Sequence, residues 1–200
     1  MIARYATLAT WLAFLSVVTQ AISDAATLNV GFYGASETAS FGLDSDEEGF
    51  PALSSSRCGL RPIINAAVGI PILRRLPQPY SNARANIVFI SPFDAADLPE
   101  TDRLDSWLRA LSTEPTLILE SPLAPEIGMS DALILREQRD LYEKIGMAAT
   151  KDHIDEIRLE ARGDQETLLQ ADGLHPNKRG HEFISSLIVG WLSSRHLCPP

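Results

Sequence analysis

The sequence predicts a doubly wound α/β sandwich, in which helices cover both faces of a mainly parallel sheet. Short runs rich in Val, Ile, Leu and Phe alternate along the chain with stretches of helical periodicity. These runs are almost continuously apolar, which is typical of parallel strands that are buried on both faces. A chain of 200 residues, 45% of them hydrophobic, is long enough to bury such a sheet in one domain.

Four short apolar runs are the expected strands, because each is bounded by residues that commonly end strands, such as Gly, Pro, Ser or Asn. The polar stretch 150–171 has weak periodicity, and we expect a surface loop there with one short strand. The four expected strands are residues 28–34 (LNVGFYG), 63–68 (IINAAV), 87–91 (IVFIS) and 117–120 (LILE).

Three stretches between and after these runs predict helices. Residues 104–111 repeat apolar side chains three and four positions apart, which places them on one helix face. Residues 131–149 show the same periodicity, and Ser130 is a candidate N-cap. The last helix is expected to begin near Pro176, a residue suited to a first turn, and to end at about Ser194.

The first 25 residues have the pattern of an export signal. Arg4 provides a positive charge, and residues 6–18 form an uncharged apolar run. A helix of that length rises roughly 20 Å against about 30 Å of hydrocarbon core, so no stable membrane span is expected. Small residues favour cleavage after Ala21 or Ala25. We therefore expect residues 1–25 to be a signal peptide, residues 26–200 to form a single domain, and the protein to be secreted or periplasmic; an uncleaved anchor is the alternative.

Charge and cysteine content limit the partners. The formal net charge of −9 repels polyanions, so nucleic acid is not an expected partner. The chain has two cysteines and no Cys or His at metal-ligand spacing, so we expect no metal site and no cofactor. Export to an oxidising compartment would permit a disulfide between Cys58 and Cys198; two independent thiols are the alternative.

A serine, a histidine and an aspartate are placed to form a catalytic group. Ligands of open α/β sheets bind outside the carboxyl ends of the strands, where Ser36 follows the first expected strand. A serine hydroxyl becomes a nucleophile when a base takes its proton, and His175 precedes the last helix. Asp172 lies three residues earlier and can orient the imidazole. Alone, Ser36 is a common turn residue and Asp172–His175 a common capping pair, but together they favour a triad.

Three segments of the sequence resemble motif blocks of the SGNH/GDSL hydrolases. DGLHPNKRGHEF, from residue 172, resembles the last block, and FYGASETA, from residue 32, resembles the first, in which Gly-Asp-Ser-x-(Ser/Thr) holds the nucleophile. IINAAVGI, from residue 63, resembles the second block, whose final glycine contributes an N–H to the oxyanion hole. The resemblance extends over about residues 27–194.

This resemblance implies a fold and a reaction. The fold is a three-layer α/β/α sandwich of the flavodoxin-like kind. Ser36 is then the nucleophile, His175 the general base and Asp172 its orienter, and the reaction is metal-free hydrolysis of an ester or related acyl bond. Two positions depart from the motifs: Ala35 stands where the first block has its acid, and Ile70 stands at the second-block glycine, with Gly69 one position earlier.

The third block departs most. Ser91-Pro92-Phe93-Asp94 stands where Gly-x-Asn-Asp is typical, so Phe93 replaces the Asn side chain that donates into the oxyanion hole. The N–H groups of Ser36 and of Gly69 or Ile70 are candidate donors. Asn65 and Ser91 are candidate side-chain substitutes; without them the enzyme would work with two donors and be slow.

The expected function is hydrolysis of the acyl ester of a small molecule or a saccharide. Two alternatives stay open: a catalytically weakened domain that binds a glycan or assists a pathway, and an acyltransferase that uses the same triad with a hydroxyl acceptor. The sequence carries no signal for an oligomeric state. The remaining residues that attract notice are expected to be solvated or at the surface, namely His153, His181, His196 and the acidic run 44–48.

Overall fold

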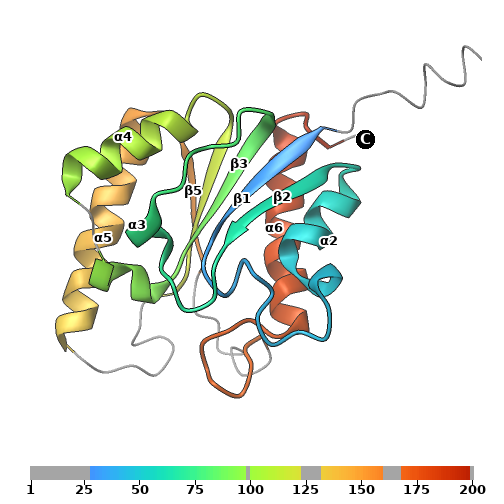
Figure 1. Cartoon of the computed structure of the whole chain (residues 1–200), viewed down its shortest axis with the longest axis horizontal. Helices are drawn as coiled ribbons and strands as arrows, with labels where there is room; N and C mark the ends of the chain where they lie inside the picture. The colour runs from blue at the N-terminus through green and yellow to red at the C-terminus, as the bar shows by residue number, and fades with distance from the viewer. Residues whose placement is uncertain (1–27, 98–99, 123–131, 160–167, 199–200) are drawn as a thin grey trace, which may run out of the picture.

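The computed structural model describes residues 28–97, 100–122, 132–159 and 168–198, so the predicted signal peptide and the candidate N-cap Ser130 lie outside the described residues. Five strands form one sheet in the order β2-β1-β3-β4-β5, and every neighbouring pair is parallel (Figure 1). The strands are β1 (Asn29–Gly34), β2 (Arg61–Ala66), β3 (Ala83–Ile90), β4 (Thr116–Glu120) and β5 (Asp155–Arg158).

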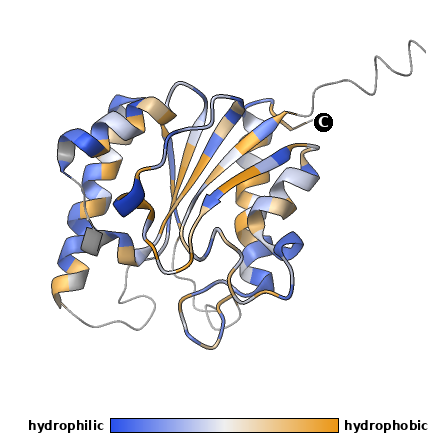
Figure 2. Ribbon diagram, viewed as in Figure 1, coloured by the Kyte–Doolittle hydropathy of each residue, from blue (hydrophilic) through white to orange (hydrophobic). Residues whose placement is uncertain are grey.

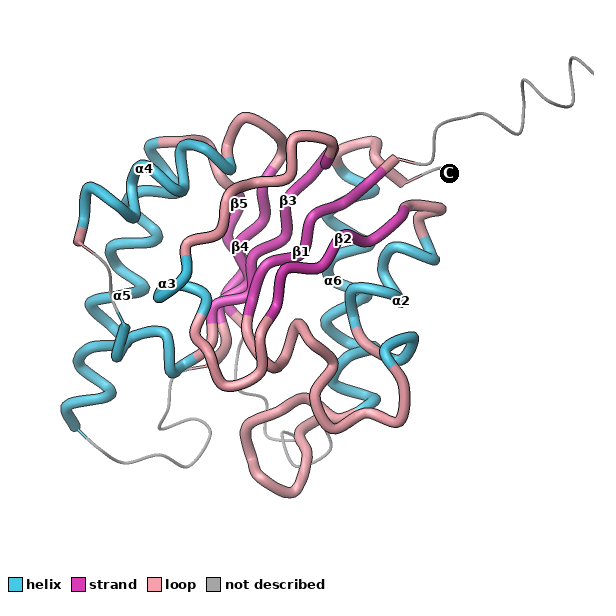
Figure 3. Tube along the Cα trace, viewed as in Figure 1, coloured by secondary structure: helices cyan, strands magenta, loops and turns pink. Residues whose placement is uncertain are grey.

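Helices cover both faces of this sheet, so the predicted α/β/α sandwich is confirmed (Figure 3). Helices α2 (Phe50–Arg57) and α6 (Lys178–Ser194) lie on one face. Helices α3 (Ile72–Arg75), α4 (Thr101–Leu111) and α5 (Ala132–Lys151) lie on the other. Two short 3-10 helices complete the described elements, η1 (Asp46–Glu48) and η2 (Pro92–Asp97).

The core is divided into two clusters by the sheet, and the strands supply both. Along β1, Phe32 packs with the α2 and α6 side, whereas the next residue, Tyr33, packs with the α4 and α5 side. Successive strand residues point to opposite faces, so a strand covered on both faces must be apolar at every position. The hydropathy colouring in Figure 2 shows this concentration of hydrophobic residues on the strands.

Strand β2 does not follow that rule, and the expectation of a fully buried strand at 63–68 is wrong. It lies at the edge of the sheet and spans Arg61–Ala66. Ile64 is 43% exposed, and no residue of β2 is buried. An edge strand has a neighbour on one side only, so its side chains are covered less completely.

The helix α2 has no clear signal in the sequence, because its serines interrupt any apolar stripe. Its first residue, Phe50, is fully buried and packs with Phe32 and Phe89 of the sheet. A disulfide joins Cys58, which directly follows α2, to Cys198, which follows α6, with the Cα atoms 4.4 Å apart. The bridge therefore ties together the two helices that cover this face.

Candidate active site

Ser36 lies in a tight turn directly after β1. Backbone hydrogen bonds close this turn: the N–H of Ala39 donates to the Ala35 carbonyl and the N–H of Phe41 donates to the Ser36 carbonyl, both at 3.1 Å. Gly34 has to be a glycine, because a Cβ there would collide with the side chain of Thr38. The turn leaves the Ser36 N–H without a hydrogen-bond partner among the described residues, and it leaves the hydroxyl at the carboxyl edge of the sheet.

His175 lies in the loop that leads into α6, and hydrogen bonds close this loop on both sides. Its carbonyl accepts from the N–H of Gln170 at 2.8 Å. Two residues later Asn177 caps the helix: its Oδ1 accepts from the Gly180 N–H at 3.1 Å, and its Nδ2 donates to the Leu169 carbonyl at 2.8 Å. The side chain of His175 is thus carried on a loop whose backbone is held at both ends.

Asp172 is fixed by the same loop. Its Oδ1 accepts the N–H groups of Leu174 at 2.9 Å and of His175 at 3.0 Å, and its Oδ2 lies 2.6 Å from Nδ1 of His175. Partial burial alone would raise the pKa of Asp172. The hydrogen bonds from the His175 ring and from the two backbone N–H groups outweigh this and lower the pKa below its usual value.

The structure brings the three predicted residues together. Nε2 of His175 lies 2.9 Å from Oγ of Ser36, although the two residues are 139 positions apart in the sequence. The Phe41 ring packs on the imidazole with its centroid 4.8 Å away, and the His175 side chain is 14% exposed. An ionised Asp172 accepts the Nδ1 proton, which leaves Nε2 as the acceptor for the serine hydroxyl.

The predicted oxyanion donors divide into free and engaged groups. Like that of Ser36, the N–H of Gly69 makes no hydrogen bond among the described residues, and this glycine is exposed with φ at +72°. The N–H of Ile70 donates to the Ala67 carbonyl at 3.3 Å. Of the two alternative candidates at this position, Gly69 therefore has the free N–H, while the N–H of Ile70 already takes part in a turn.

The two predicted side-chain substitutes use their oxygens as acceptors, so the Nδ2 group of Asn65 and the hydroxyl proton of Ser91 are the groups left to donate. Oδ1 of Asn65 accepts from Nη1 of Arg75 at 2.6 Å, and Nη2 of Arg75 donates to the Gly34 carbonyl at 2.8 Å. Oγ of Ser91 accepts from the N–H of Phe93 at 3.2 Å, and the Phe93 side chain is 40% exposed. The sequence did not point to Arg75, because nothing in the chain pattern places its guanidinium beside the turn that carries Ser36.

Glu37 and Asp94 are two neighbouring buried carboxyl groups, and the first of them contacts Ser36. Oε2 of Glu37 is 3.3 Å from Oγ of Ser36, and burial raises the pKa of Glu37. Asp94 accepts from the N–H of Leu73 at 3.0 Å and of Ser91 at 2.8 Å, so it joins α3 to the end of β3. Burial, together with the charge of Glu37, raises the pKa of Asp94 to about 7. Sequence reasoning missed Glu37, although it directly follows Ser36, because a charged turn residue is usually solvated.

His181 is a further correction, because it is fully buried and not at the surface. Its Nδ1 accepts from the N–H of Phe50 at 3.2 Å, and the two rings stack with centroids 5.6 Å apart. Burial lowers the pKa of His181 to about 4, and the charge of His175 adds to this effect. The residue is a neutral part of the packing between α6 and α2.

No family model matches the chain, and no curated protein matches its sequence. Forty chains of known structure match its fold, and they include GDSL-type lipases and a carbohydrate esterase. The chain has an SGNH/GDSL hydrolase-like fold.

Three of the similar structures are TesA, an esterase and an acyltransferase, and each matches more than four fifths of this chain. TesA is 20% identical, with a TM-score of 0.63 and with 83% of this chain and 98% of TesA covered. The esterase EstA from Pseudoalteromonas sp. is 17% identical, with a TM-score of 0.61 and coverage of 84% and 98%. The salicylyl-acyltransferase SsfX3 from a tetracycline biosynthetic pathway is 15% identical, with a TM-score of 0.65 and coverage of 86% and 56%.

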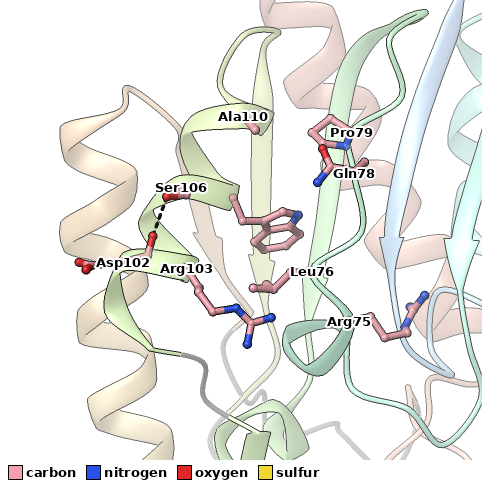
Figure 4. A pocket seen from close by; sticks show the side chains of 9 residues that line it. Arg75, Leu76, Gln78, Pro79, Asp102, Arg103, Ser106 and Ala110 are labelled. Atoms are coloured by element: carbon pink, nitrogen blue, oxygen red, sulfur yellow. Dashed lines mark hydrogen bonds between the residues drawn. The ribbon is translucent and has the colours of Figure 1, made fainter.

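An open pocket of about 410 Å³ lies beside α4, on the α3 side of the sheet (Figure 4). Ser36, Asp172 and His175 do not line it, but Arg75 does, and the same guanidinium contacts the carbonyl of Gly34 two residues before Ser36. The side chain of Arg75 therefore connects the pocket to the turn that carries Ser36. Its other lining residues are Leu76, Gln78, Pro79, Asp102, Arg103, Ser106, Trp107 and Ala110.

The described residues contain no group of three or more His, Cys, Asp or Glu side chains arranged to hold a metal ion. In the acidic run 44–48, Glu48 pairs with Lys178 at 2.5 Å. None of the helices in the described ranges has the length and apolar character needed to cross a bilayer.

Proposed function

We propose that the protein is a secreted or periplasmic serine esterase that hydrolyses an acyl ester. Ser36 is the nucleophile, His175 the general base and Asp172 the residue that orients the base. One observation carries the proposal: the 2.9 Å contact between Oγ of Ser36 and Nε2 of His175, continued by the 2.6 Å contact between Nδ1 and Asp172. A nucleophile, a base and an orienting carboxylate at these distances form the arrangement that acyl hydrolysis uses.

The proposed reaction has two steps. His175 takes the hydroxyl proton of Ser36 while Oγ attacks the ester carbonyl, and the free N–H groups of Ser36 and Gly69 are the proposed donors to the oxyanion. The protonated His175 returns that proton to the leaving alcohol, which leaves an acyl group on Oγ. A water molecule, deprotonated by His175, then attacks the acyl group, and the acid leaves as Ser36 recovers its proton.

The proposed substrate is an acylated small molecule or saccharide. The carbohydrate esterase among the similar structures supports a saccharide, as does the export pattern of residues 1–25. The disulfide between Cys58 and Cys198 is compatible with an oxidising compartment. The export proposal is tested by locating the full-length protein in the cell or the medium. A second test titrates the thiols of the unfolded, non-reduced protein, and two free thiols would count against export.

Acyl transfer is the second candidate function. The acyltransferase SsfX3 shares the fold, and transfer uses the same covalent step with a hydroxyl acceptor in place of water. A weakened domain that binds a glycan without turnover is favoured by a different observation, the exposed Phe93 at the position of the oxyanion donor.

The experiment that tests the enzyme proposal is labelling with a fluorophosphonate probe, which reacts with activated serines. The wild type should be labelled, and Ser36→Ala should abolish both labelling and hydrolysis of a small activated ester. Ser56→Ala is the matched control, because Ser56 is exposed on α2. A folded wild type that neither labels nor hydrolyses esters would favour the binding function. Transfer to an added alcohol that exceeds hydrolysis would favour the acyltransferase.

A further inference from the structure

The carboxyl group of Glu37 lies against the nucleophile and has no part in the triad. Its side chain is turned into the protein, with 3% of the residue exposed, and its Oε2 is 3.3 Å from Oγ of Ser36. The hydroxyl of Ser91 and the backbone N–H of Glu37 itself also face the carboxyl group. Among the described residues, no Lys, Arg or His forms an ion pair with it.

The single hydroxyl proton of Ser36 cannot serve both of the acceptors beside it. The hydroxyl has one proton, and two acceptors compete for it: Nε2 of His175 at 2.9 Å and Oε2 of Glu37 at 3.3 Å. Because Asp172 accepts the Nδ1 proton of His175, the unprotonated Nε2 takes the serine proton at the shorter distance. Two oxygen atoms, Oγ and Oε2, then face each other with no proton between them unless Glu37 carries one.

The surroundings of Glu37 favour the protonated form. Burial disfavours its charge, and the carboxyl group of Asp94 is close enough for a charge on Glu37 to raise the pKa of Asp94. Backbone N–H groups meet both oxygens of Asp94 and lower its pKa, while burial and the charge of Glu37 raise it to about 7. The charge of a protonated His175 acts in the opposite direction on Glu37, as do the weaker hydroxyl contacts.

We infer that Glu37 works as a neutral carboxylic acid that donates its proton toward Oγ of Ser36 and, during the reaction, toward the oxyanion beside it. It supplies the donor that Phe93 cannot, and it returns to the turn the acid that Ala35 lacks. The inference rests on the proposed hydrolase function. The proton is shared and not transferred: His175 alone takes and returns the proton of Ser36. A carboxylic acid that is kept neutral by an apolar site to donate a hydrogen bond is an established way to stabilise an oxyanion.

The experiment compares Glu37→Gln, which keeps a neutral donor, with Glu37→Leu, which has none. Glu182→Gln is the matched control, because Glu182 is exposed on α6. Hydrolysis of p-nitrophenyl acetate is followed from pH 5 to pH 10. Glu37→Gln should keep activity within about threefold of the wild type near neutral pH, and Glu37→Leu should lose about 10²–10³ in kcat, the usual cost of one oxyanion donor.

The pH profile separates a donor from a packing role. The wild type and Glu182→Gln should lose activity at high pH as Glu37 ionises, and Glu37→Gln should not show this loss. Three results would each overturn the inference: Glu37→Gln as inactive as Glu37→Leu, full activity in Glu37→Leu, or the same alkaline loss in Glu37→Gln.

Infrared spectroscopy tests the protonation of Glu37 without turnover, and therefore independently of the proposed esterase function. The infrared difference spectrum between the wild type and Glu37→Gln at pH 7 should contain the carbonyl band of a protonated carboxylic acid, and the spectrum for Glu182→Gln should not. Absence of that band overturns the inference whatever the activity. Unchanged hydrolysis in Ser36→Ala would instead refute the proposed esterase, while the infrared result still decides whether Glu37 is neutral.

Discussion

Two carboxyl groups flank the pair of Ser36 and His175, and they differ in almost every physical respect. The Asp172 side chain is 42% exposed and meets two backbone N–H groups and the imidazole. Glu37 is 3% exposed and meets two hydroxyls and only its own N–H. The pKa of Asp172 is lowered, whereas burial raises the pKa of Glu37. The same chemical group is therefore suited to act as an anion on one side of the Ser36–His175 pair and as a neutral acid on the other.

The largest expected effect is on the Asp172 side. Asp172→Asn should lower kcat by about 10⁴, because an amide no longer selects the imidazole tautomer that accepts from Ser36. Steady-state hydrolysis of an activated ester measures the loss, with Asp44→Asn as a control for removing an exposed negative charge. A loss below tenfold would mean that Asp172 is not the orienting anion, and the contrast with Glu37 would no longer hold.

The next largest effect is expected from Phe93→Asn, which tests whether Glu37 acts as the oxyanion donor. In the Glu37→Leu background, Phe93→Asn should raise kcat by about tenfold or more, because it restores a side-chain donor. In the wild type the gain should be smaller, because Glu37 already fills that role. The double-mutant cycle on kcat measures the coupling between the two positions. Equal gains in both backgrounds would show that Glu37 and Phe93 act independently.

A smaller effect concerns the loop that carries Asp172. Asn177→Ala should lower the free energy of unfolding by about 1 kcal/mol, because it removes the N-cap of α6. The Asn177 side chain also donates to the Leu169 carbonyl, so its loss should loosen the loop that carries Asp172 and lower kcat. The turn that carries Ser36 and Glu37 should be unaffected. Urea denaturation and ester hydrolysis give the two values, and Asn82→Ala in an exposed loop is the control. Unchanged stability would show that the loop is held without this cap.

The smallest expected effect is on the pH dependence of stability. The folded pKa of Glu37 is raised, so its contribution to stability is fully present below the unfolded pKa of about 4.3 and is lost as the pH rises through the folded pKa. Glu37→Gln should therefore reduce the fall in free energy of unfolding between pH 5 and pH 8. Part of the fall should persist, because the pKa of Asp94 is also raised, to about 7.

Asp172 should change the pH dependence of the free energy of unfolding in the opposite direction to Glu37. Its folded pKa is lowered, so its contribution is present above the unfolded pKa and is lost as the pH falls through the folded value. Asp172→Asn should therefore flatten the acid side of the stability curve, from about pH 4 downward, and leave the change between pH 5 and pH 8 in place. Urea titrations at pH 3, 5 and 8 separate the two variants; the same change in both would contradict the comparison.

The parts of the site that could be predicted from the sequence are local in the chain. Gly34 and Ser36 mark the end of an apolar strand, and Asp172 and His175 are three positions apart before a helix with a recognisable start. The end of a parallel strand faces the ligand edge whatever the neighbouring elements are. For that reason the sequence alone pointed to Ser36 and Asp172, which the structure places 2.9 and 2.6 Å from the two ring nitrogens of His175.

The sequence by itself determined the alternation of strands and helices, the two apolar faces of the central strands and the chemistry of the Ser36, Asp172 and His175 side chains. Only the tertiary structure decided which polar groups lose contact with water. The strand order places β1 between β2 and β3, which buries Glu37 near Asp94 and brings Arg75 to Gly34, and the packing of α6 on α2 buries His181. Burial and neighbouring charge set a pKa, and both depend on elements distant in the sequence, so the protonation of Glu37 cannot be read from its place beside Ser36.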